Sequence, residues 1–343
     1  MAPAMKLIQM VTEDPALAAV KFDSSRTMKQ LADKFLPIVC DNVAKWESCW
    51  RDVGSDMGVY TWPLNDEGSE FAGNALPHNQ YSKMISVLLP LYDLTGNDEY
   101  LDHAKRMLTF LKSKMRLVSQ NGQELYYWTY YSSTGSDPIK QSENTEDISH
   151  GALDVEAAIV GYEYGLVFNE TDMKRITNTF LKTLWNGSTT DPEMYSNIVY
   201  NPSAQGYHRP MTSEMNIREW TRLARWEPSI ADGVSAFFNQ NSGKQGVGHP
   251  AKLLTYACLY EAKSTPVTGL ALEKTAGSIS QTAGAEEQVS FRAEPNSSRY
   301  TGVSWTVSKN GSLFATGRGK TFSFKPSGAV SYTHLIMPLR RQI

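Results

Sequence analysis

Cysteine and histidine are scarce in this chain, which limits the chemistry it can support. It has 3 cysteines and 6 histidines among 343 residues. Three cysteines (Cys40, Cys49 and Cys258) do not make a disulfide framework, and we expect buried thiols. The sequence contains no H-E-x-x-H motif, no phosphate loop and no Cys/His spacing typical of a metal site. We therefore expect no metal and no cofactor.

Long apolar runs and an excess of charge of one sign are also missing. No stretch approaches the ~18 consecutive apolar residues of a membrane span. The N-terminal stretch MAPAMKLIQMVTEDP has too short an apolar part for a signal peptide. The net charge is −3 and the pI is near 6.1, so the electrostatic footprint of a nucleic-acid-binding protein is absent. We expect neither a nucleic acid partner nor a membrane span.

Helical periodicity dominates the chain up to residue 263. Apolar residues recur at steps of three and four in 27–50, 78–95, 98–112, 146–168, 171–186, 214–226, 228–240 and 250–262. Gly96 reads as a helix stop, Asn97 or Asp98 as the next helix start, and Asn144 as an N-cap. Repeated helical hairpins with alternating long and short connections predict a mainly α fold, an (α/α) toroid. The number of predicted helices is too small for a closed ring, so we expect an incomplete one.

After Lys263 the sequence becomes rich in Ser, Thr and Gly, with apolar residues at every second position. Lys309-Asn310-Gly311-Ser312 is a strong hairpin signal. These features predict a small immunoglobulin-like β-sandwich over 264–333, with Trp305 in its core. Residues 334–343 do not continue the alternation and are expected to form a disordered tail. Residues 1–263 would then form the toroid domain.

Four polar patches fall where predicted helices begin. They are residues 74–81, 143–150, 200–210 and 218–226. Taken singly, the residues of each patch are more often helix caps, exposed loop residues or part of a solvated helix face than functional groups. Within 143–150, His150 falls between Glu146 and Asp154 at steps of four, which places the three on one helical ridge. A toroid would bring all four patches to one end, where its long connections form a binding mouth.

Three short segments carry a resemblance to a known family. The aromatic run YYWTYY (126–131), the helix start ENTEDISHG (143–151) and the later YHR (207–209) resemble (α/α)-toroid polysaccharide lyases, the group that includes alginate and glucuronan lyases. The closest match is polysaccharide lyase family 38, over about residues 27–262. The resemblance implies β-elimination of a uronic-acid polysaccharide, and thus a polyanionic substrate. It also implies that the protein is a monomer and that it is periplasmic or secreted.

Residue roles follow from the same resemblance. Tyr207 would act as base and acid and His150 as the second proton-transfer group. Asn79 and Glu143 would contact the substrate carboxyl group, and Arg209 would clamp it. The remaining contacts to substrate would come from Trp128, Tyr130, Trp62, His78, Glu146 and Arg218. Tyr200 and Tyr81 are rivals of Tyr207.

The implied reaction has a clear physical requirement. A proton next to a carboxylate is weakly acidic, so the site must place donors where negative charge develops. Tyrosine is a poor base at its ordinary pKa of about 10, and Arg209 beside Tyr207 would favour the phenolate. Glu143 would have to be protonated to donate a hydrogen bond, and burial could keep it so by raising its pKa.

Two other interpretations stay open. In one, the toroid is a glycoside hydrolase that pairs Glu146 or Asp147 with Asp66 or Glu67. In the other, the protein is a non-catalytic glycan-binding surface protein with an aromatic groove. A lyase creates an unsaturated uronate that absorbs ultraviolet light, whereas a hydrolase creates only reducing ends.

Overall fold

The computed structural model describes residues 2–64, 71–135, 137, 145–198, 210–211 and 215–241, together with six C-terminal strands. The chain divides into two compact units. One consists of Met1–Ile8 and Asp33–Lys263, and the other of Gln9–Ala32 and Ser264–Ile343. The second unit includes Gln9–Ala32, although the sequence predicts that this segment belongs to the toroid domain. The helix predicted at 250–262 lies outside the described residues.

The chain begins with three helices, α1 (Ala2–Glu13), α2 (Pro15–Ala19) and α3 (Met28–Ala44). The helix predicted to reach residue 50 ends at Ala44, and a 3-10 turn, η1 (Glu47–Cys49), follows. The reason is a β-hairpin, β1 (Trp50–Val53) with β2 (Met57–Tyr60), in which Trp50 pairs with Tyr60. Trp50 therefore belongs to a strand, although its spacing continued the helical pattern.

The first predicted helical hairpin is confirmed as α4 (His78–Thr95) and α5 (Asp98–Lys114), which pack against each other. Gly96 ends α4 with a φ of 69°, a left-handed conformation in which glycine is not strained. The side chain of Asn97 then accepts a hydrogen bond from the backbone N–H of Glu99 and starts α5. A hairpin of strands β3 (Arg116–Gln120) and β4 (Gln123–Tyr127) follows.

The second predicted hairpin comprises α6 (Ile148–Glu163) and α7 (Glu170–Thr179), which continues into a π-helical turn, η2 (Phe180–Leu184). Asn169 and Asp172 form a capping box at the start of α7. The cap of α6 differs from the prediction. Asp147 is the N-cap, because its side chain accepts from the backbone N–H groups of the two residues that follow Ile148. Asn144 lies outside the described residues.

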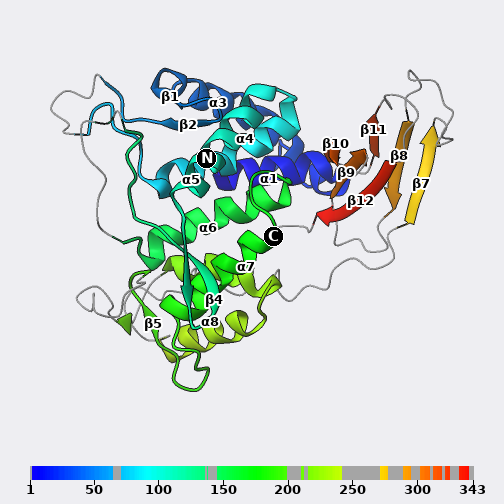
Figure 1. Ribbon diagram of the computed structural model, residues 1–343. Coiled ribbons are helices and arrows are strands. Elements are labelled where there is room, and N and C mark those ends of the chain that lie inside the picture. Colours follow the sequence, from blue (N-terminus) through cyan, green and yellow to red (C-terminus); the bar gives the residue numbers. More distant parts are fainter. Residues whose placement is uncertain are drawn as a thin grey trace. The chain divides into compact units, whose positions relative to one another are not determined.

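The third pair is η4 (Met215–Arg225), a 3-10 helix, and α8 (Ser229–Gln240). Between the second and third pairs lie two short paired strands, β5 (Met194–Tyr195) and β6 (Pro210–Met211). Helix α6 packs against α4, α5, α7 and η4. Figure 1 shows α6 between α5 and α7. Small and branched residues on α6 are completely buried at these contacts, including Ala152, Val155, Ala158 and Ile159. The mainly helical class, with small antiparallel sheets, is confirmed.

The C-terminal part of the second unit contains two three-stranded antiparallel sheets. One has the order β10 (Ser312–Arg318), β9 (Gly302–Lys309), β12 (Tyr332–Leu339), and the other β11 (Thr321–Phe324), β8 (Val289–Glu294), β7 (Ala271–Ala276). Lys309 pairs with Ser312, the register that the hairpin signal in the sequence predicts. An immunoglobulin-like arrangement stays a prediction.

The chain end differs from its prediction. Residues 334–339, expected in a disordered tail, belong to β12, which pairs with β9 over its whole length. Backbone pairing to an existing strand does not require alternating apolar side chains, which explains why the pattern missed it.

Among the described residues, no helix has both the length and the apolar character that crossing a membrane requires.

Packing of Trp185, the residue after η2, against α8 provides a test of the fold. A Cβ atom added at Gly233 in α8 would lie 2.4 Å from the buried Trp185 ring. Helix propensity alone would make Gly233→Ala stabilising by about 0.5–1 kcal/mol. We expect the steric clash to outweigh this gain, so the variant should lose about 1–3 kcal/mol of unfolding free energy in urea titration. Ser235→Ala on the same helix is the matched control; a stabilised Gly233→Ala would contradict this packing.

Candidate functional site

An extended segment, Thr145–Asp147, leads into α6 and is held on both sides by backbone contacts. The N–H of Glu146 donates to the carbonyl of Trp128 at 3.1 Å, and the N–H of Ile198 donates to the carbonyl of Glu146 at 2.8 Å. Isolated bridges join Thr145 to Thr129 and Asp147 to Asn197. The residues just before α6 are therefore positioned by two distant parts of the chain.

The Asp147 side chain contacts both the helix and an imidazole. Its Oδ1 accepts from the N–H groups of Ser149 and His150, both at 2.8 Å. Its Oδ2 lies 2.5 Å from His150 Nδ1. When Nδ1–H donates to this carboxylate, Nε2 is the unprotonated nitrogen of the neutral ring. The His150 side chain is 44% exposed, so a ligand can reach it.

Tyr130 completes the exposed part of this group. Its ring lies edge to face with His150, with 5.0 Å between centroids. Burial raises the pKa of Tyr130, and the negative charges of Glu146 and Asp147 add to the shift. The phenol is therefore neutral at physiological pH and can donate a hydrogen bond, but it is a poor base.

Beneath this group lie two carboxyl groups with no exposed surface, Glu146 and Asp154. Asp154 accepts hydrogen bonds from Ser82 Oγ at 2.9 Å and from Trp128 Nε1 at 3.0 Å. Glu146 Oε1 accepts from the N–H of Asp147 at 2.8 Å, and Oε2 has no hydrogen-bond partner among the described residues. Gly151 permits this packing, because a Cβ there would lie 3.0 Å from Glu146 Cγ.

Burial sets the charge of this pair. Loss of hydration raises the pKa of Asp154 to about 7, against the opposing effect of its hydrogen bonds from Ser82 and Trp128. Burial and the nearby charge of Asp154 raise the pKa of Glu146 well above its usual range. The pair therefore retains at least one proton at neutral pH, as is usual for two carboxyl groups confined together.

The start of α4 supplies two further predicted residues. His78 is 1% exposed and contacts Tyr81 OH and, at 2.9 Å, Ser132 Oγ. Burial lowers the pKa of His78 to about 3, so the ring is a neutral interior group with no surface for a substrate. Asn79 is 8% exposed, and its Oδ1 lacks a hydrogen-bond partner among the described residues. Burial also raises the pKa of Tyr81, the rival base, well above 10, and leaves it protonated.

The structure brings together some of the predicted residues and not others. His150, Glu146 and Tyr130 form one group with Asp147, and Trp128 adjoins it. Trp128 is 1% exposed, however, so its ring offers no face for a sugar to stack on. The Trp62 ring lies 6.3 Å from that of Phe71, and no contact joins it to His150 in the part of the chain that the structure describes. The remaining predicted side chains lie outside that part: Glu143, Tyr200, Tyr207, Arg209, Arg218, Asp66 and Glu67.

The predicted helical ridge is wrong in one respect. Glu146 precedes the helix, and Asp154 is completely buried while His150 is partly exposed. The four-residue spacing could not show that Glu146 and Asp154 are interior acids while His150 is at the surface. The signal missed was Gly151, which leaves room for Glu146 against the first turn of α6.

Glu146, Asp147 and His150 also form a donor set that could hold a metal ion, with ligand atoms within 4.8 Å of one another. The short contact between Asp147 and His150 and the cap made by Asp147 already account for two of these side chains. These contacts explain the positions of Asp147 and His150 without a metal ion.

No protein-family model, curated protein or solved structure matches this chain.

The buried acid pair makes stability depend on pH. The pKa of Asp154 rises from 3.8 in the unfolded chain to about 7 in the folded one, so the folded protein binds more protons between these values. Its free energy of unfolding should fall as the pH rises through that window, by about 2–4 kcal/mol. In Asp154→Asn the amide oxygen can still accept from Trp128 Nε1 and the amide N–H can donate to Ser82 Oγ, so the variant should fold and should make the decline shallower in urea titrations from pH 4 to 8. Parallel curves for both proteins would contradict the raised pKa.

Proposed function

We propose that the first unit is a polysaccharide lyase that cleaves a uronic-acid-containing polysaccharide by β-elimination. The observation that carries the proposal is the His150 imidazole, oriented by Asp147 and exposed beside Tyr130. A carboxylate on one ring nitrogen orients the other nitrogen toward substrate and stabilises the imidazolium that forms when it takes a proton.

The packing of the helices supports the toroid part of the proposal. Helices α4, α6 and η4 are the first members of three successive pairs, and α6 packs against both of the others. A row of first helices is the arrangement expected for the inner layer of an incomplete (α/α) toroid. The long connections that precede these helices would then form the binding mouth.

The elimination needs a proton acceptor, a proton donor and a group that neutralises the uronate carboxylate. We assign His150 and Tyr207 to proton transfer, and Asn79, Glu143 and Arg209 to the carboxylate. The amide N–H groups of Asn79 would donate to the carboxylate, whereas its buried Oδ1, which lacks a partner among the described residues, could accept from a sugar hydroxyl. Tyr130, a neutral phenol, would contact the sugar.

The protonated acid pair would favour a polyanion. A fully ionised Glu146 and Asp154 beneath the site would repel a uronate, whereas a pair that holds a proton repels it less. A hydrolase that used Glu146 as an acid or a nucleophile would need that carboxyl group to reach a glycosidic bond. Glu146 is 0% exposed, which favours the lyase over this alternative.

Activity is tested with a panel of alginate, glucuronan and glycosaminoglycans. We expect at least one polymer to yield products that absorb in the ultraviolet band of unsaturated uronates. New reducing ends without absorbance would instead indicate a hydrolase. Binding without any product would indicate a glycan-binding protein, and either result would overturn the lyase proposal.

Substitutions then test the assigned group. His150→Ala should lower kcat by about 10²- to 10⁴-fold, the usual contribution of a proton-transfer residue. Asp147→Asn preserves a good helix cap but removes the carboxylate from the imidazole, so kcat should fall with little change in thermal stability. The control is Tyr164→Phe at the far end of α6, which removes a hydroxyl bonded to Asp93. Full activity in His150→Ala would exclude the assigned role.

A further inference from the structure

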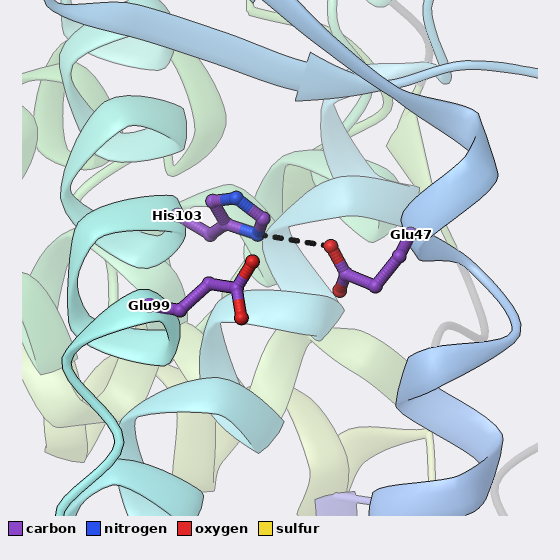
Figure 2. Close-up of side chains that lie close together, drawn as sticks. All are labelled: Glu47, Glu99 and His103. Atoms are coloured by element: carbon purple, nitrogen blue, oxygen red, sulfur yellow. Dashed lines mark ion pairs between the residues drawn. The ribbon is translucent and has the colours of Figure 1, made fainter.

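A second cluster of ionisable side chains lies within the first unit and shares no residue with the His150 group. It consists of Glu47 from η1 and of Glu99 and His103 from the first turns of α5. Figure 2 shows the three side chains directed toward one another from the two segments. One ligand atom from each lies within 4.8 Å of the others. Glu99 and His103 are four residues apart, which places both on one face of the helix.

His103 is held rigidly by aromatic rings. It is 7% exposed and stacks on Trp50 with 3.8 Å between ring centroids and 11° between planes. The Tyr60 ring packs against it edge to face, at 6.2 Å and 84°. An imidazole enclosed in this way has a defined orientation, so the direction of Nδ1 toward Glu47 is fixed by packing rather than by a strong polar contact.

The polar neighbours of His103 Nδ1 are too distant for good hydrogen bonds. Tyr60 OH lies at 3.5 Å and Glu47 Oε2 at 3.6 Å, whereas hydrogen bonds of this kind are usually about 2.7–3.2 Å long. A buried nitrogen with only such weak contacts needs an explanation. Two ligands of one tetrahedral Zn²⁺, each about 2.0–2.2 Å from the ion, lie about 3.4 Å apart. The observed 3.6 Å is closer to that separation than to a hydrogen bond.

The charges of the cluster also favour a cation. Among the described residues, neither Glu47 nor Glu99 forms an ion pair with a lysine or arginine, and His103 is the sole ion-pair partner of Glu47. Tyr60 OH donates to Glu47 Oε1 at 3.1 Å, which orients the other oxygen toward His103. Hydrogen bonds that orient a ligating carboxylate in this way are typical of metal sites.

We propose that Glu47, Glu99 and His103 bind Zn²⁺, with water as a fourth ligand. An imidazole with two carboxylates suits Zn²⁺ better than Ca²⁺ or Mg²⁺, which prefer oxygen ligands alone. Glu99 is exposed, so its side chain can rotate to complete the site. The ion would link η1 to α5, which are separated in sequence by β1, β2 and α4, and would stabilise this part of the fold.

The experiment uses the full chain, freed of any histidine tag, treated with chelator and then titrated with ZnCl₂ alone by calorimetry. We expect one equivalent of Zn²⁺ to bind at this site and to raise Tm, because a ligand bound only by the folded state stabilises it. Glu99→Gln removes an exposed ligand without disturbing the core, and should weaken binding at least tenfold and abolish the shift in Tm.

Two control variants make the result specific. Asp102→Asn changes an exposed carboxylate on the same helix, outside the cluster, and should bind Zn²⁺ as the unsubstituted chain does. His150→Ala tests the other possible donor set and should leave this equivalent intact. The proposal is overturned if the chain binds no Zn²⁺, if Glu99→Gln binds it equally well, or if His150→Ala removes it. None of these outcomes depends on lyase activity, so this proposal and the proposed function fail separately.

Discussion

The carboxylate of Asp147 is the group on which the candidate site depends. One of its oxygens accepts the first free N–H groups of α6, and the other accepts from the imidazole of His150. Helix and imidazole are therefore oriented by a single side chain, itself held in an extended segment that pairs with two distant strand-like stretches. Removing this side chain altogether would free the imidazole and also uncap α6.

Directly beneath that contact, burial and hydrogen bonding shift the pKa values of two acids in opposite directions. Glu146 and Asp154 receive hydrogen bonds that favour their charged forms, yet the loss of hydration is larger and leaves the pair partly protonated. Close packing makes this possible, since both acids are completely buried and a Cβ at position 151 would lie 3.0 Å from Glu146 Cγ. The same burial that lowers stability at high pH reduces negative charge beneath an imidazole that we assign to a polyanionic substrate. The cost in stability and the proposed function thus have one physical origin.

Local sequence determined much of the helical part of the fold. The stop at Gly96, the start at Asn97 and the capping box at Asn169 each arise from interactions within a few residues, so they could be predicted without the tertiary structure. Predictions failed where a more distant partner competed. Trp50 leaves the helical pattern because it pairs with Tyr60, and β12 forms because β9 offers a strand edge.

For the candidate site, the sequence alone determined which residue types stand near the start of α6 and which of them can transfer protons. It could not determine which of these residues face solvent. His78 and Trp128 are enclosed by residues distant in sequence, whereas His150 remains accessible. Likewise, the four-residue spacing of Glu99 and His103 is visible in the chain, but their approach to Glu47 is not. Burial and long-range proximity are properties of the packed chain, and they decide the charge and reach of each ionisable group.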